Sequence, residues 1–552
     1  MVRFLIPVIA VLISTTPCSA AEQDLNRARQ LIKEAQDGCE QDGKFLLKLA
    51  TVQAKAGDIP AAGQSFSRAW RAVEKRDDET QRRVMLIEIA RQQTEAGLSA
   101  EAVKSARQQS PSNVELLLNT IAVTLAESGQ TKAALKVVKL NPDLNSSQRN
   151  FTLSLLAMQF SEHRKFVDAY QTLNLIPVNE QLVTAILARK VPAEQLTPAE
   201  QAEISRAQLK ATGLIVITQD QANAGDWDAA LQTAQKILLP LQREIALRHI
   251  VNTAAESDQL MLAQSVLNRI QGDEQKQLAT VPVVCCLAEQ KQFMEARQLS
   301  QQIEDKSIRA EALYGIAVAY AAGGNRRKAH SLFADGVALV PADLEAKHAA
   351  ARQIVSAFLQ ASILPAAEDF TTEIQDPETR AAALQEIAVA GAQLEKNDVQ
   401  RLFNRSREVA GTIRDPYQRS VRLREIAKAE FLTGQVKQAR MTIREAIQAA
   451  QQMELGGGSD VIAITEAARV QTTIGDLKGA ADSFRLARDT ARRYPERSYV
   501  VELLQGVVFA QAQSGDIEAA IESVRREESV CDRCLMLLEI ADALLTPSRP
   551  DP

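Results

Sequence analysis

The chain has 552 residues, of which 46% are hydrophobic, 24% are charged and 4% are aromatic, a composition that excludes intrinsic disorder as its general state. Its net charge of −5 is built from interspersed acidic and basic residues, so the chain carries no global basic field. We therefore expect no non-specific binding of nucleic acid.

The N-terminal residues have the layout of a secretory signal peptide. Arg3 precedes an apolar run at residues 4–13, and small residues follow at positions 18–21. The run is too short to span a bilayer, and no later segment is long and apolar enough to do so. We expect a signal peptide at residues 1–20, export to the periplasm or the medium, and a mature chain without a membrane span. Retention as an anchor and lipidation at Cys18 are the weaker alternatives.

Residues 305–340 read as one helical hairpin. Two apolar stripes at helical spacing flank the turn sequence Gly323-Gly324-Asn325. A hairpin of this size has too little apolar surface to fold alone, so it must stack on neighbours. The rest of the chain supplies near-copies of it.

Thirteen candidate turn residues recur along the chain, mostly 32 to 41 residues apart. They are Gly57, Gly97, Gly129, Arg164, Gly225, Asp258, Lys291, Gly324, Ser362, Asn397, Gly434, Gly475 and Gly515. Twelve of them are followed five positions later by alanine, and only Asn397 is followed by another residue, Leu402. Self-similarity at this period indicates a helical repeat.

Two further positions share this phase. An aliphatic residue followed by a small one often lies eight positions before the turn, and a bulky residue often lies nine after it. Examples are Ile316-Ala317 and Ile426-Ala427 for the first position, and Phe66, Phe333, Ile443 and Phe484 for the second. Small residues let two antiparallel helices approach closely, and the bulky one fills the gap to the next hairpin.

With these positions the chain resembles the tetratricopeptide repeat family. The resemblance implies an all-α fold, an α-solenoid forming a right-handed superhelix of about 13 stacked helical hairpins. The chain departs from the family late in the first helix, where the expected aromatic residue occurs only at Phe160, Tyr320 and Phe358.

The register breaks between Arg164 and Gly225. Thr197, Pro198 and Glu200 have the pattern of a capping box with proline in the first turn, so a new helix should begin at Pro198. We expect a joint at 190–197 that separates helical-repeat segments at 21–190 and 198–545, followed by a disordered tail at 546–552. The joint is either a hinge or a repeat whose second helix is degraded, and the sequence leaves both open.

Helix starts recur in the second half of the chain. Asp305, Asp343, Asp376 and Asp415 each precede a basic residue by four positions, namely Arg309, Lys347, Arg380 and Arg419. An aspartate at a helix start accepts hydrogen bonds from free N–H groups and suits the positive end of the helix dipole. Helix capping with surface ion pairs is the interpretation that we favour over a binding pattern.

No motif indicates catalysis. The four histidines are scattered, and neither a metal-ligand spacing nor a phosphate-binding or dinucleotide-binding loop occurs. We expect no catalytic residue, no metal and no cofactor. Cys531 and Cys534 are either free thiols or a disulfide that requires a distorted helix start, because residues three apart on a helix hold their Cβ atoms too far apart.

In tetratricopeptide-like arrays the first helices line a concave groove, and positions about ten and six residues before the turn face into it. Transferring this phase gives Arg248, Asn252, Tyr314, Arg352, Arg424, Lys428 and Arg469. Recurring basic residues there favour an acidic peptide or a chain-terminal carboxylate as the partner. The alternative is that these arginines only cover apolar surface with their stems.

The sequence supports an exported, non-catalytic scaffold or adaptor that binds another protein through this groove. An enzyme on an α/α scaffold, such as a polysaccharide lyase or hydrolase, is the alternative, but such folds are usually richer in aromatic residues than 4%. A repeat protein that spaces or stiffens an envelope assembly is a third possibility.

Overall fold

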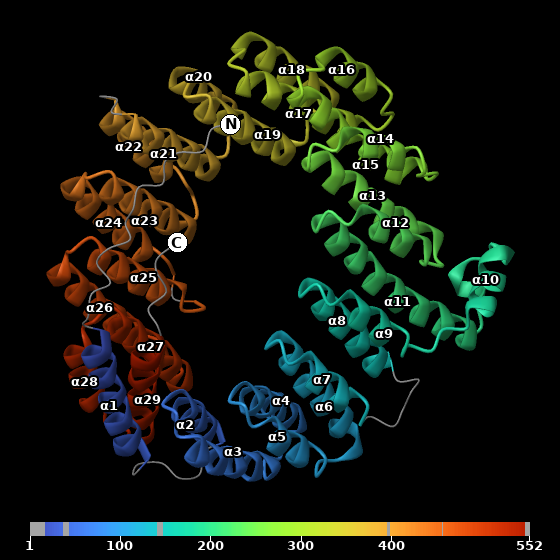
Figure 1. Ribbon diagram of the computed structural model, residues 1–552. Helices are drawn as coiled ribbons and strands as arrows, with labels where there is room; N and C mark the ends of the chain where they lie inside the picture. Colours follow the sequence, from blue (N-terminus) through green and yellow to red (C-terminus); the bar gives the residue numbers. More distant parts are fainter. Residues whose placement is uncertain (1–16, 37–42, 141–146, 395–397, 455, 547–552) are drawn as a thin grey trace. The chain divides into compact units, whose positions relative to one another are not determined.

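Figure 1 shows the computed structural model, which describes residues 17–36, 43–140, 147–394, 398–454 and 456–546. Within these residues the chain forms 29 α-helices and two short 3₁₀ helices, and no strand. The predicted all-α fold of stacked helical hairpins is confirmed. The predicted run of residues 4–13 and the tail from residue 547 lie outside the described residues.

The chain forms two compact units. Unit 1 combines the residues up to Ser105 with those from Ile443 onward, and unit 2 contains Ala106–Thr442. The joint predicted at 190–197 lies inside unit 2 and stays a prediction. At this position Lys190 ends a helix in the left-handed conformation, and the predicted capping box at Thr197 starts the next helix at Pro198.

Unit 2 is a stack of hairpins in which each first helix packs on the next first helix, while each second helix packs on its own first helix and on the following one (Figure 1). The first helices are α6 (Pro111–Glu127), α8 (Ser147–Glu162), α11 (Pro198–Asn223), α13 (Pro240–Glu256), α15 (Asp273–Glu289), α17 (Lys306–Ala322), α19 (Leu344–Gln360), α21 (Pro377–Gln393) and α23 (Pro416–Leu432). The second helices are α7 (Thr131–Val138), α9 (Phe166–Leu173), α12 (Trp227–Gln235), α14 (Leu260–Leu267), α16 (Phe293–Gln301), α18 (Arg326–Leu339), α20 (Leu364–Phe370) and α22 (Val399–Gly411). Outside the pattern lie α10 (Glu180–Arg189) and the 3₁₀ helices η1 (Ala193–Gln195) and η2 (Thr371–Glu373).

Unit 1 is built from both ends of the chain. It contains α1 (Pro17–Gln36), α2 (Gly43–Lys55), α3 (Ile59–Glu74), α4 (Glu79–Glu95), α25 (Ser459–Thr473), α26 (Leu477–Ala491), α27 (Arg497–Gln513), α28 (Ile517–Arg525) and α29 (Val530–Leu545). Two helices cross the borders of the units, namely α5 (Ser99–Ala106) and α24 (Val436–Ala450). In unit 1 the helices α25, α27, α29, α2 and α4 stack in this order, so the last helix is followed in the stack by helices from the start of the chain.

The predicted turn residues end the first helices in the left-handed conformation. Twelve of the thirteen have positive φ, from 57° at Arg164 to 87° at Gly515, and Asn397 lies outside the described residues. The N–H of the next residue donates to the carbonyl five positions back, as from Asn325 to Tyr320 at 2.8 Å. This Schellman geometry satisfies carbonyl groups that the helix end leaves free.

Four of these turn residues are not glycine, although the left-handed conformation costs other residues about 1 kcal/mol. We therefore expect Arg164→Gly and Lys291→Gly each to raise the free energy of unfolding by about 0.5–1 kcal/mol, measured by urea denaturation. Lys139→Gly is the matched control, because Lys139 caps α7 in the right-handed conformation and glycine there loses backbone entropy without relieving strain. A destabilised Lys291→Gly variant would contradict this prediction.

The predicted alanine positions lie where the two helices of a hairpin meet. All twelve alanines are buried, and the bulky residues Phe66, Phe333, Ile443 and Phe484 are buried beside them. At the exception, Leu402 is also buried. The repeat therefore rests on close helix contact through small side chains, as the spacing predicted.

The missing aromatic residues late in the first helices have a structural replacement. In several hairpins this position holds a polar side chain that hydrogen bonds to Ser or Thr on the second helix, twelve residues further on. The pairs are Gln53 with Ser65 at 2.7 Å, Gln221 with Thr233 at 2.6 Å, and Glu430 with Thr442 at 2.6 Å. All six residues are buried, so a hydrogen bond takes the place of ring packing inside these hairpins.

Each predicted aspartate cap is confirmed: the side chains of Asp305, Asp343, Asp376 and Asp415 accept from the backbone N–H three residues on. Arg309, four positions after Asp305, donates from Nε to the carbonyl of Ile303 at 2.7 Å. Arg243 makes the same contact at the start of α13, whose N-cap is Leu239, and donates from Nε to the carbonyl of Ile237 at 2.9 Å. These arginines hold the end of the preceding hairpin against the start of the next.

Candidate functional site

All seven residues predicted to face the groove lie on first helices. Unit 2 contains Arg248 and Asn252 on α13, Tyr314 on α17, Arg352 on α19, and Arg424 and Lys428 on α23, while unit 1 contains Arg469 on α25. The structure therefore places them on five different helices, four in unit 2 and one in unit 1.

Tyr314 is buried, whereas the sequence predicted that it faces the groove. Its side chain is only 5% exposed, and its ring packs on Phe333 with the ring centres 5.6 Å apart. Gly336 on α18 leaves the space that this ring occupies, because a Cβ atom there would clash with it. Burial raises the pKa of Tyr314, as expected for a phenol in the core.

Three of the predicted basic residues form ion pairs with glutamates that also lie on first helices. Arg352 forms an ion pair with Glu386 at 2.7 Å, and Lys428 and Arg469 lie 3.4 Å from the glutamates three positions before them. Exposed pairs of this kind are weak, but they cancel much of the positive charge. The first helices therefore carry both positive and negative side chains at these positions.

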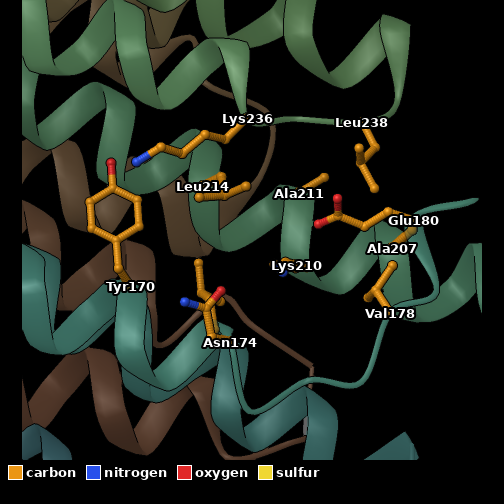
Figure 2. Close-up of a pocket in the computed structure, with 11 residues that line it drawn as sticks. Tyr170, Asn174, Val178, Glu180, Ala207, Lys210, Ala211, Leu214, Lys236 and Leu238 are labelled. Carbon is orange, nitrogen blue, oxygen red and sulfur yellow. The ribbon is translucent and has the colours of Figure 1, made fainter.

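A different site lies where the repeat register breaks. After α9 the chain runs through residues 174–179 into α10, and α11 is 26 residues long, so α9, α11 and the connection from α12 to α13 leave a cavity of about 370 Å³ (Figure 2). Its apolar wall is formed by Leu173, Val178, Ala207, Ala211, Leu214 and Leu238. We call it the α9–α11 pocket.

Charged and polar groups surround this apolar wall. Lys210, Lys236, Glu180 and Asn174 line the α9–α11 pocket, and Figure 2 shows the Lys236 side chain extended toward Tyr170. The Lys236 ammonium lies over the Tyr170 ring, 4.3 Å from its centre. Neither lysine forms an ion pair with a carboxylate in the described part of the chain. Two ammonium groups against one carboxylate give the pocket a positive balance.

A hydrogen-bond network with two buried residues fixes Tyr170 in the wall of the pocket. Its hydroxyl is hydrogen bonded to Thr233, which donates to Gln221 at 2.6 Å. Burial raises the pKa of Tyr170, while its hydrogen bond with Thr233 acts in the opposite direction. Because the effect of burial is larger, the hydroxyl stays neutral at physiological pH. The ring is therefore a preformed apolar and polarisable wall that holds Lys236 in place.

The sequence located the irregular segment but did not identify this pocket. The available signs were the 61-residue gap between Arg164 and Gly225 and the interruption of the second-helix pattern after Leu173. The lining lysines carry no motif, because they converge from α11 and from the end of α12 only after folding.

The chain is a helical-repeat protein. No family model matches its sequence, and no curated protein matches it either. Among solved structures it is similar to the crystal structure of Ton1535 from Thermococcus onnurineus NA1, with 14% identity, a TM-score of 0.24 and coverage of 59% of this chain and 98% of that one. It is also similar to the APC/C hetero-tetramer Cut9-Hcn1, with 14% identity, a TM-score of 0.20 and coverage of 80% and 93%. A third match is Naa15/Naa10 bound to HypK-THB, with 14% identity, a TM-score of 0.29 and coverage of 80% and 68%.

Other reactive groups lie apart from the pocket. Cys531 and Cys534 are free thiols on α29, the first exposed and the second buried, and burial raises the pKa of Cys285 on α15 to about 12. Among the described residues, histidine, cysteine and carboxylate side chains form no group of three that could hold a metal ion. None of the described helices is long and apolar enough to cross a membrane.

Proposed function

We propose that this protein is an exported, non-catalytic scaffold of tetratricopeptide-like repeats that binds a protein partner along its first helices. The α9–α11 pocket in unit 2 is its anchoring point and takes an acidic segment of the partner. Export rests on the N-terminal layout of a basic residue, an apolar run and small residues.

The observation that carries this proposal is the pairing of an apolar wall with two ammonium groups. A carboxylate of the partner between Lys210 and Lys236 forms charge-assisted hydrogen bonds, and an adjacent apolar side chain covers Leu173 and Leu214. Within the residues that the structure describes, neither lysine is paired with a carboxylate, so binding adds ion pairs without breaking any of those described. Glu180, which also lines the pocket, disfavours a second acidic group close by.

Fluorescence polarisation with labelled peptides tests this function. The probes are nonapeptides that alternate Glu or Asp with Leu or Phe, and matched peptides in which Lys replaces each acidic residue. We expect the acidic set to bind and the basic set not to bind. Lys210→Ala combined with Lys236→Ala is expected to weaken binding by at least about tenfold, since each charge-assisted hydrogen bond contributes about 1.5–3 kcal/mol.

Two further variants locate the site. Arg424→Ala with Lys428→Ala removes basic residues of the first-helix layer, and Lys165→Ala with Lys328→Ala removes two lysines outside the pocket. We expect the first pair to have a small effect and the second to have none. Acidic peptides that bind equally well to the Lys210→Ala, Lys236→Ala variant would reject the pocket as the anchor, and binding of neither peptide set would reject the acidic partner.

A further inference from the structure

The first and last described helices are each one half of a hairpin. α29 packs on α27 as a first helix does, and the structure describes no helix after it. α1 precedes the first complete hairpin, α2 with α3, and the structure describes no helix before it. Within the described residues, neither helix has a hairpin partner next to it in the sequence.

α1 has the residue pattern of a second helix. Two second helices of unit 1, α3 and α26, place alanine, a bulky residue and alanine at relative positions 0, 4 and 7. The sets are Ala62, Phe66 and Ala69 in α3, and Ala480, Phe484 and Ala487 in α26, and α1 has Ala28, Ile32 and Ala35 at the same spacing. All nine side chains are buried.

α29 has the complementary pattern of a first helix. Ile540-Ala541 is an aliphatic residue followed by a small one, as in Ile316-Ala317 of α17, and both residues of α29 are fully buried. α1 packs along α29 and also contacts α2, which stacks on α29 as the next first helix. These are the contacts that the second helices α3, α26 and α28 of unit 1 make with their own first helix and with the following one.

Ion pairs between distant parts of the sequence join the same helices. Arg27 of α1 pairs with Glu518 of α28, and Glu34 of α1 lies 3.3 Å from Arg525 at the end of α28. The two pairs lie seven residues apart on both helices, so they run along the side of α1 that faces α28.

We propose that α29 and α1 form one split repeat, in which α29 is the first helix and α1, the first described helix, is the second. The surface of α28, α29 and α2 is then a binding site for one helix, the α1 segment of the same chain. Displacement of α1 exposes the apolar faces of α29 and α2 and opens the stack of unit 1. Cleavage after Ala20 leaves Ala28, Ile32 and Ala35 in the mature chain.

Amide hydrogen exchange of the full chain tests this split repeat. Ala28→Arg places a long charged side chain in the contact with α29, and Gln30→Arg adds the same side chain at an exposed position of α1. We expect exchange in α29 and α2 to become at least about tenfold faster in Ala28→Arg and to stay unchanged in Gln30→Arg. Unchanged exchange in α13–α17 shows that unit 2 remains folded.

A synthetic peptide of residues 21–36 then supplies α1 in trans. It is expected to restore protection of α29 in the Ala28→Arg chain, whereas the same peptide with Ala28→Arg is not. Glu34→Arg removes the ion pair with Arg525 and is a milder variant, in which we expect exchange in α29 to be about two- to threefold faster. Adding Arg525→Glu restores an ion pair of reversed polarity and should return the exchange rate toward that of the unsubstituted chain. Protection of α29 that is indifferent to Ala28→Arg, or that the peptide does not restore, overturns the split repeat.

Discussion

Replacing Lys48 by methionine is expected to lower the free energy of unfolding of unit 1 by about 3 kcal/mol. The Lys48 ammonium on α2 lies 2.8 Å from Glu539 and 2.7 Å from Asp542, both on α29, and all three side chains are largely buried. Burial raises the pKa of Glu539, although the Lys48 ammonium acts to lower it. Burial acts in the same direction on Asp542, yet Lys48 and Lys55 hold the pKa of Asp542 below its usual value. Methionine keeps the packing but removes the ammonium group to which Glu539 is hydrogen bonded.

Urea denaturation and its pH dependence measure this loss. Lys33→Met, at an exposed lysine of α1, is the control and is expected to change stability by less than about 0.5 kcal/mol. Adding Glu539→Gln to Lys48→Met removes the unpaired carboxylate, leaves Asp542 with Lys55 at 2.5 Å, and should recover most of the loss. Lys48 acts to lower the pKa of Glu539, so its removal raises the folded pKa of this carboxyl further above the unfolded value. The variant loses stability as the pH rises through that folded pKa, so the deficit of Lys48→Met should grow as the pH rises from 5 to 8. A deficit independent of pH would contradict this mechanism.

The repeat itself was predictable from the sequence, because its determinants are local. A left-handed turn residue, an alanine five positions later and an aliphatic-small pair eight positions before are all set within one hairpin. Even Arg164 and Ser362, which are poor residues for positive φ, were placed correctly as turns, since their neighbours fixed the phase. The helix start at Pro198 was predictable for the same reason.

Contacts between distant residues were not predictable in this way. Arg27 and Glu518 are 491 residues apart, and no local pattern shows that α1 completes the repeat of α29. The groove position of Tyr314 was transferred from a family pattern, and it differs because Gly336 opens a space in the facing helix. The α9–α11 pocket depends on where an irregular connection runs, which spacing alone does not determine.

Phe370→Ala is expected to lower the free energy of unfolding of unit 2 by about 3–5 kcal/mol. Phe370 is fully buried on α20, where its ring contacts His330 and Phe333 of α18 and Phe358 of α19, with ring centres 3.9, 5.7 and 5.8 Å away. Alanine removes the ring that these helices share and leaves a cavity, because a stack of hairpins cannot collapse without shifting its neighbours. Phe151→Ala is the matched control, since Phe151 on α8 is 53% exposed and its loss should cost less than about 0.5 kcal/mol.

Each hairpin contacts only its neighbours, so amide exchange in Phe370→Ala should accelerate in α18–α21 and remain unchanged in α8 and α11. Equal losses for the two variants, or faster exchange throughout unit 2, would show that stability is not held locally by each pair of hairpins.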